Sequence, residues 1–234
     1  MTAAPVALIT GIGPGTGRAL AERFAAGGYR LALLSRNAER LKAITESLAD
    51  ARAFVCDVAD GGALANTLET VKATMGAPKI VVHNAVGGAF GNFLDIDPAV
   101  LSANFQTNCM ALLHIARATV PDMIASGGGA IIATGNTSAY RGKAGFAAFA
   151  PSKAAQRILL ESIARHSGPM GVHAAYVAID AVIDVPWTRK MAPDKPDDFF
   201  AQPADIAEEV FRIAHQPRTT WSFESVIRPF GETW

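Results

Sequence analysis

Short aliphatic segments alternate regularly with longer helical segments along this chain of 234 residues, and this alternation constrains the fold more than any other feature. Strands that alternate with helices favour a parallel sheet covered by helices on both faces. The sequence therefore predicts a single α/β domain over residues 1–234, built on a doubly wound seven-stranded sheet. The predicted strands are Val6–Thr10, Arg30–Leu34, Ala53–Cys56, Ile80–His83, Ala130–Thr134, Val172–Val177 and Phe223–Ile227. The predicted helices are Gly17–Ala26, Ala38–Leu48, Leu64–Met75, roughly Pro98–Ile124, and Phe146–Arg165.

Charge and composition argue against several classes of partner. Basic and acidic residues number 21 each, which leaves no net field to attract nucleic acid or an anionic membrane. No segment sustains the roughly 18 apolar residues of a membrane helix, and no export signal precedes Val6. Cys56 and Cys109 lie in apolar segments and are not in a Cys-x-x-Cys spacing. This pattern is typical of buried free thiols in a reducing compartment. We expect a cytoplasmic protein that binds a small molecule and no metal.

A glycine-rich turn follows the first predicted strand. Thr10 is followed by Gly11, Gly13, Gly15 and Gly17, and the last of these begins a predicted helix. Such a turn aims backbone N–H groups and the helix dipole at a phosphate. Taken alone, the pattern also fits an ordinary tight turn, and its spacing is not Gly-x-Gly-x-x-Gly. It predicts a dinucleotide site only in combination with other motifs.

Those other motifs follow in order. The turn matches Thr-Gly-x-x-x-Gly-x-Gly, and the chain resembles the short-chain dehydrogenase/reductase family over nearly its whole length. Asp57 matches the family's adenine-contacting aspartate, Asn84 an asparagine of its Asn-Asn-Ala-Gly turn, and Asn108 the structural and catalytic asparagine of its fourth helix. The resemblance implies a Rossmann-type fold and nicotinamide-dependent hydride transfer. It also implies that Ile183 offers backbone groups to the cofactor's amide.

The end of the second predicted strand indicates which nicotinamide cofactor is used. An acidic residue about 20 positions past the glycines would bind a ribose 2′-hydroxyl. The chain has Ser35 and Arg36 there, which suit hydrogen bonding and ion pairing with a 2′-phosphate. We therefore expect NADP(H), with NAD(H) less favoured; the alternative is a solvated arginine at a helix start.

The chain departs from the family where the catalytic residues are expected. The resemblance implies a tyrosine as acid or base, a lysine four residues later, and a serine upstream. Lys153 matches the lysine, but Phe149 occupies the tyrosine position and Asn136 the serine position. Asp180–Ala181 and Val185 replace the family's Pro-Gly turn and its nicotinamide-contacting threonine. The residues expected to bind the nucleotide are therefore predicted to be functional, whereas the residues expected to carry out catalysis are altered.

Loss of the phenol slows carbonyl reduction without forbidding it, because a positioned general acid contributes about 10² to 10⁴ in rate. Asn136 can donate a hydrogen bond to an oxyanion but supplies no proton. Lys153 and Asn108 with a water chain are one proton source. Tyr140 is another, although a partly exposed aromatic residue lining the pocket is the plainer interpretation. An iminium ion or an enone, which needs no proton in the same step, would tolerate Phe149.

Two functions fit these residues. The first is an NADP(H)-dependent oxidoreductase for a small carbonyl, imine or enone; the second is a catalytically inactive NADP(H)-binding protein used for sensing or assembly. The segment Val185–Pro203 is rich in proline and aspartate, which discourages regular structure and predicts a substrate lid. The resemblance implies a homodimer or homotetramer through the helices that hold Asn108 and Lys153. The aromatic C-terminal segment Trp221–Trp234 suits burial against a neighbour or the lid.

Overall fold

A seven-stranded parallel sheet forms the centre of the protein in the computed structural model, which describes residues 3–231. Its strand order is β3-β2-β1-β4-β5-β6-β9, and every predicted strand is present with its bounds moved by two residues or fewer. The predicted doubly wound sheet is thus confirmed. The strands are β1 (Val6–Thr10), β2 (Arg30–Ser35), β3 (Ala51–Val55), β4 (Pro78–His83), β5 (Gly129–Gly135), β6 (Val172–Ile179) and β9 (Glu224–Ile227).

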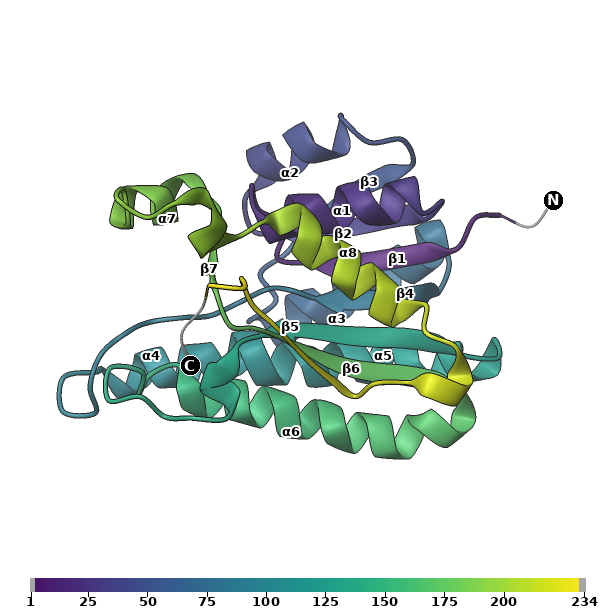
Figure 1. The fold of residues 1–234 in the computed structure, drawn as a ribbon. Coiled ribbons are helices and arrows are strands. Elements are labelled where there is room, and N and C mark those ends of the chain that lie inside the picture. Colours follow the sequence, from purple (N-terminus) through teal and green to yellow (C-terminus); the bar gives the residue numbers. More distant parts are fainter. Residues whose placement is uncertain (1–2, 232–234) are drawn as a thin grey trace.

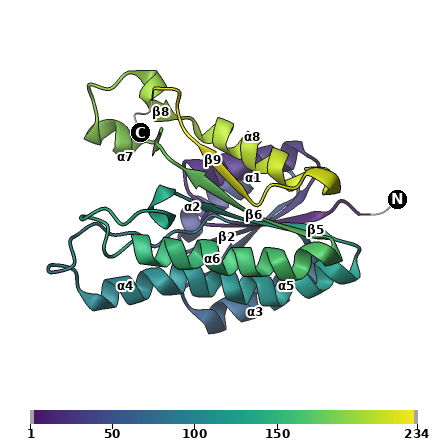
Figure 2. The same cartoon turned by 60° about the horizontal axis from the view of Figure 1, so that its bottom comes forward.

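Helices cover both faces of this sheet (Figures 1 and 2). One face packs against α1 (Thr16–Ala26), α2 (Ala38–Thr45) and α8 (Pro203–Ala214). The opposite face packs against α3 (Gly61–Met75), α5 (Ala111–Ala125) and α6 (Ala150–Ser167), and α4 (Pro98–Phe105) lies beside α6. The strand order reverses between β1 and β4, so the loops after these two strands diverge and leave a crevice at the carboxyl edge.

The structure differs from the predicted helices at three places. The single helix expected over 98–124 is interrupted between α4 and α5 by a π-helical turn, Gln106–Met110. Helix α6 begins at Ala150 because Phe146 to Phe149 close a turn, with the Phe149 N–H donating to the Phe146 carbonyl at 3.0 Å. Helix α8 was not predicted, although Ile206, Val210 and Ile213 repeat at helical spacing and are buried.

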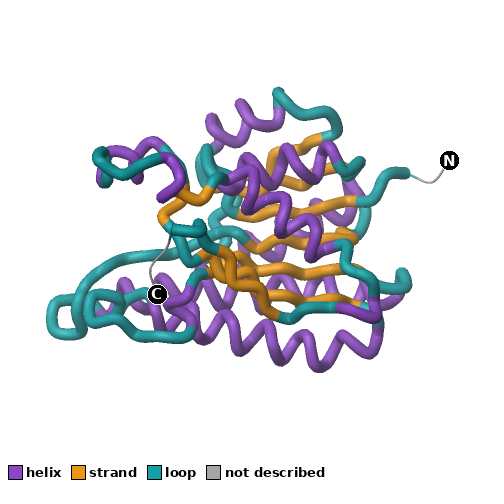
Figure 3. Tube along the Cα trace, in the orientation of Figure 1, coloured by secondary structure: helices purple, strands orange, loops and turns teal. Residues whose placement is uncertain are grey.

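The prediction of irregular structure over Val185–Pro203 is wrong in part. This segment contains α7 (Pro186–Met191) and β8 (Phe200–Ala201), and β8 pairs with β7 (Val182–Ile183). Pro186 occupies the first helical position of α7, where a backbone N–H would have no partner within the helix. The Arg189 guanidinium ties the segment together, because it contacts both Asp184 and Asp197 at 2.7 Å. Figure 3 shows the segment at the carboxyl edge of the sheet.

The remaining expectations concern membranes, cysteines and the C-terminus. Among residues 3–231, no helix has the length and apolar character needed to span a membrane. Cys56 is buried, whereas Cys109 is only half-buried, and both are free thiols. Trp234, the last aromatic residue of the C-terminal segment, lies outside the described residues.

Candidate active site

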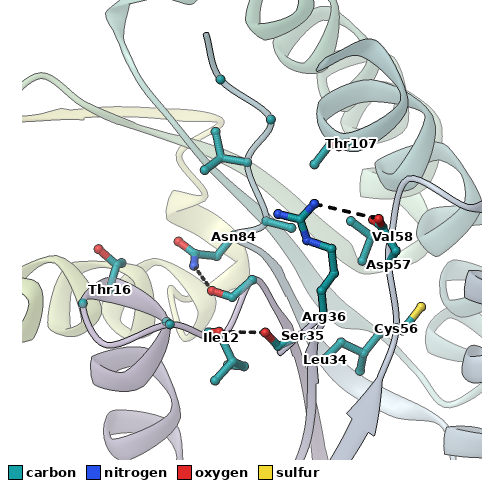
Figure 4. A pocket seen from close by; sticks show the side chains of 18 of the residues that line it. Ile12, Thr16, Leu34, Ser35, Arg36, Cys56, Asp57, Val58, Asn84 and Thr107 are labelled. Carbon is teal, nitrogen blue, oxygen red and sulfur yellow. Dashed lines mark hydrogen bonds and ion pairs between the residues drawn. The ribbon is translucent and has the colours of Figure 1, made fainter. Parts of the chain in front are cut away.

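A cavity of about 660 Å³ lies at the crevice between β1 and β4. The glycine turn, the ends of β2, β3 and β4, and β7 contribute to its wall, as Figure 4 shows for many of the side chains. The cavity brings together every residue predicted to bind the cofactor except Lys153. These residues are Gly11, Gly13, Gly15, Gly17, Ser35, Arg36, Asp57, Asn84 and Ile183.

The glycine turn is packed backbone against backbone. Gly11 has φ +73°, and a Cβ atom there would lie 2.4 Å from the Ala85 backbone nitrogen. A Cβ atom on Gly17 would lie 2.4 Å from the Gly11 carbonyl oxygen. Gly13 has no atom within 4 Å of its Cβ position, so that side of the turn is open to the cavity. The turn therefore needs glycine for its conformation at Gly11 and leaves room for a ligand at Gly13.

The N-terminus of α1 at this turn fits a phosphate. Helix α1 has 11 residues and begins after Gly15, which provides no side-chain cap. The Thr16 hydroxyl is buried and finds no hydrogen-bond partner among the described residues. An anion would satisfy both this hydroxyl and the unpaired first-turn N–H groups. Val185 lies over the turn, since its Cγ1 would be 2.5 Å from a Cβ atom on Gly15.

Two arginines face the opposite end of the cavity. Arg36 forms a long ion pair with Asp57, 3.8 Å between Nη1 and Oδ2, and both side chains are largely exposed. An exposed pair of this kind is weak and easily exchanged for a phosphate. Arg40, which was not among the predicted cofactor residues, lines the same cavity. Ser35 differs from the expectation, because its hydroxyl proton is donated to the Ile12 carbonyl at 3.0 Å and holds the turn against β2.

Asn84 connects the glycine turn to β5. Its amide nitrogen donates to the Gly11 carbonyl at 3.0 Å, and its amide oxygen accepts from the Thr134 hydroxyl at 2.9 Å. Thr134 continues this connection, because its backbone carbonyl accepts from Lys153 Nζ at 3.4 Å. A chain of hydrogen bonds therefore links the cofactor turn to the lysine.

His83 is a polar core residue whose role the sequence did not reveal. Its Nε2 lies 3.1 Å from the Thr107 carbonyl, which only accepts, so Nε2 carries the proton. Its Nδ1 then accepts from the Thr10 hydroxyl at 3.0 Å, and that oxygen accepts from the Ala85 N–H at 3.2 Å. Burial, aided by the positive charge of Lys153, lowers the pKa of His83 to about 4. The neutral ring thus joins the glycine turn to the π-helical turn before α5.

Lys153 is turned into the protein and does not line the cavity. Its Nζ donates to the Gln156 amide oxygen at 2.9 Å, in addition to the weaker Thr134 contact. The Phe149 ring centre lies 5.8 Å from Nζ, within the range of a cation–π contact. Lys153 is 2% exposed, and this burial lowers the pKa of its amine to about 7.

The two predicted catalytic asparagines both make structural hydrogen bonds. Asn108 is fully buried in the π-helical turn; its oxygen accepts from the Gly87 N–H, and its nitrogen donates to the Gly87 carbonyl and the Ser152 hydroxyl. Its amide therefore fixes the loop after β4 against α6. The Asn136 oxygen accepts from the Ser138 N–H at 3.1 Å, and its backbone contacts the buried Tyr176 hydroxyl.

Tyr140 and Asp180 both engage other residues. The Tyr140 ring stands beside Arg157, 5.3 Å from the guanidinium carbon, and burial together with Glu224 raises the pKa of Tyr140 to about 12. This makes Tyr140 a poorer proton donor than Lys153 at neutral pH. Asp180 pairs with Arg141 at 3.2 Å, so its carboxylate is engaged in an ion pair.

The fold and this cavity define an α/β protein with a dinucleotide site at the carboxyl edge of its sheet. The model of the short chain dehydrogenase family matches residues 5–195, so the chain belongs to this family of oxidoreductases. It is 28% identical to human 3-oxoacyl-[acyl-carrier-protein] reductase (92% of this chain, 93% of the relative). It is 26% identical to 7alpha-hydroxysteroid dehydrogenase of Escherichia coli K12 (96% and 92%). A metagenomic short-chain oxidoreductase in complex with NADP superposes with a TM-score of 0.84 at 28% identity (96% and 97%).

Proposed function

We propose that this chain is an NADP(H)-dependent oxidoreductase that transfers hydride to or from a small carbonyl, imine or enone. The observation that carries this proposal is one cavity that combines the open side of the turn at Gly13 and the unpartnered Thr16 hydroxyl, among the described residues, with two arginines, Arg36 and Arg40. The similarity to an oxidoreductase in complex with NADP supports the choice of cofactor.

Each part of the cavity has a defined task in this proposal. The nicotinamide cofactor supplies the hydride when bound. The N-terminus of α1 and the Thr16 hydroxyl hold the pyrophosphate, and Arg36 with Arg40 holds the 2′-phosphate. Ile183 lines the cavity beside the lid segment, although its carbonyl already accepts from the Thr188 hydroxyl at 2.6 Å. The Ile183 N–H is then the backbone group to offer to the carboxamide.

Titration with NADPH and NADH tests the proposal. The natural chain is expected to bind NADPH more tightly, and Arg36→Ala is expected to remove most of that preference, about tenfold or more for a charge-assisted contact. Lys42→Ala, on the exposed side of α2, is the matched control and should bind both cofactors as the natural chain does. Equal or tighter binding of NADH by the natural chain would contradict the assignment.

The second candidate function is a cofactor-binding protein without turnover. The inward position of Lys153 and the absence of a hydroxyl on Phe149 favour it. Phe149→Tyr, alone and combined with Asn136→Ser, discriminates between the two functions when assayed on ketones, imines and enones. Turnover by the variants only would indicate a binding protein, whereas turnover by the natural chain would establish the enzyme.

The cellular setting and assembly complete the proposal. Free cysteines and a balanced charge fit the cytoplasm, and membership of the family favours a homodimer or a homotetramer. Light scattering of the purified protein measures the oligomeric state directly.

A further inference from the structure

The proton source that replaces the missing phenol can be sought among the buried groups around Phe149. The Phe149 ring is 7% exposed and faces Gly88, a residue of the cavity wall, so it stands between the cavity and Lys153. Asn108 has every amide atom engaged, and the raised pKa of Tyr140 opposes proton release. Lys153, whose Nζ lies 5.8 Å from the Phe149 ring centre, is then the candidate donor beside the tyrosine position.

Within the described part of the chain, the hydrogen bonds of Lys153 go to two neutral oxygen atoms. The Gln156 contact at 2.9 Å is a full hydrogen bond, whereas the Thr134 contact at 3.4 Å is near the limit for one. One N–H of the ammonium group is therefore firmly held and the others are easily redirected. These N–H groups can exchange the Thr134 carbonyl for another acceptor on the side of the Phe149 ring.

Among residues 3–231, no carboxylate forms an ion pair with this amine. The ionisable groups on the elements packed around it are Lys79 and His83 on β4, Cys109 before α5, His114, Arg117 and Asp122 on α5, His173 and Tyr176 on β6, and Tyr140 and Arg141 after β5. Asp122 pairs with Lys72 at 2.7 Å. On α6 itself, Arg157 pairs with Glu161 and Glu224, Arg165 also pairs with Glu161, and His166 is exposed. Asp180 is held by Arg141 and Arg228. Burial alone therefore sets the proton affinity of Lys153, and the pKa of about 7 lets it donate a proton at neutral pH.

The buried amide of Gln156 destabilises the folded protein, and its contact with Lys153 explains why an amide stands there. The residue is fully buried, and its amide nitrogen has no hydrogen-bond partner among the described residues. An unsatisfied buried donor destabilises a protein, so methionine would serve better if this position were only packed. The amide oxygen supplies an acceptor without a charge, which orients the amine and leaves its proton transferable.

We propose that Lys153 itself donates the proton to the substrate oxygen, and that Gln156 is the positioning residue that holds its amine. This inference rests on the proposed function and narrows its substrate to a carbonyl compound. As the hydride from the bound cofactor adds to the carbonyl carbon, the π electron pair of the C=O bond moves to oxygen. The oxygen takes a proton from Lys153 Nζ, and the neutral amine then takes a proton from water.

Gln156→Glu tests the proposal, with Gln156→Met as the matched neutral control. A carboxylate at position 156 stabilises the ammonium form, so the pKa of Lys153 should rise by at least about one unit. NMR titration of the apoprotein labelled with 13C at lysine Cε, with the signal assigned through Lys153→Met, measures this shift without cofactor. The rate of ketone reduction should decline above about pH 7 in the natural chain and in Gln156→Met, and about one unit higher or more in Gln156→Glu.

The outcomes are separable from those of the proposed function, because NADPH binding is measured on each variant. Normal NADPH binding with Lys153 titrating as an ordinary lysine in the natural chain would overturn this inference alone. This inference would also be overturned if Gln156→Glu changed neither the pKa of Lys153 measured by NMR nor the pH profile of the rate. It would be overturned if Gln156→Met raised the Lys153 pKa and the pH profile as much as Gln156→Glu does. Reduction of imines without reduction of ketones would overturn it as well. Failure of the natural chain to bind NADPH would overturn the proposed function, and the donor role with it, whatever the lysine titration shows.

Discussion

The buried neutral His83 should make the stability of this protein sensitive to mild acid. Its pKa is about 4 in the folded protein and 6.5 in the unfolded chain. Between these values the unfolded chain binds a proton at His83 that the folded protein does not, so the free energy of unfolding falls as the pH falls. The difference of about 2.5 units corresponds to roughly 3 kcal/mol lost between pH 6.5 and pH 4. The lowered pKa of Lys153 acts only above about pH 7, outside this window.

Urea denaturation of the natural chain and His83→Asn at half-unit steps from pH 7 to pH 4 measures this effect. Carboxylates contribute almost equally to both proteins, so the difference between their unfolding free energies isolates the histidine. That difference should shrink by roughly 3 kcal/mol toward pH 4. His166→Asn, at an exposed position on α6, is the control and should follow the natural chain throughout. Parallel curves for the natural chain and His83→Asn would refute the reasoning.

Three further outcomes follow from the same geometry. Gly11→Ala should lower the free energy of unfolding, measured in thermal melts, by more than Gly28→Ala does. Both glycines have positive φ, which costs an alanine about 1 kcal/mol, but only a Cβ atom at position 11 would also meet backbone atoms. Equal losses would contradict the packing of the turn. Arg189→Leu should speed hydrogen exchange over 185–201 and nowhere else, because it removes the link between Asp184 and Asp197; unchanged exchange would mean that the link does not order the segment. Tyr140→Phe should change the turnover rate less than twofold; a loss of about tenfold or more would restore this hydroxyl as the acid.

Local sequence pattern was sufficient for the parts of the fold that local physics determines. The aliphatic run of the central strand β1 is buried on both faces of the parallel sheet, and the glycine turn needs positive φ at Gly11. The π-helical turn could not be predicted, because it places Asn108 between Gly87 and Ser152, and these contacts come from distant segments. Proline in Val185–Pro203 was misleading because Pro186 and Pro203 begin helices instead of preventing them.

The candidate site divides in the same way. Residues of the cofactor cavity follow strand ends and so were identified by position, and Arg40 could have been found as the second arginine after β2. The environment of Lys153 depends on Thr134 from β5, on burial, and on Gln156. Only Gln156, three residues later on the same helix face, was visible in the sequence. Proton affinity in a buried site is a property of such tertiary neighbours and cannot be assigned from a motif.

His83 and Lys153 also have to be considered together, because both are buried bases and the charge of one disfavours the charge of the other. The site therefore accepts a single positive charge near neutral pH. Burial leaves that charge on Lys153, because it lowers the pKa of His83 to about 4 and that of Lys153 only to about 7. Restoring a tyrosine at position 149 would add a polar hydroxyl without adding a charge, whereas Gln156→Glu would add the missing negative charge. Gln156→Glu is therefore expected to raise the pKa of His83 as well as that of Lys153, which Phe149→Tyr is not.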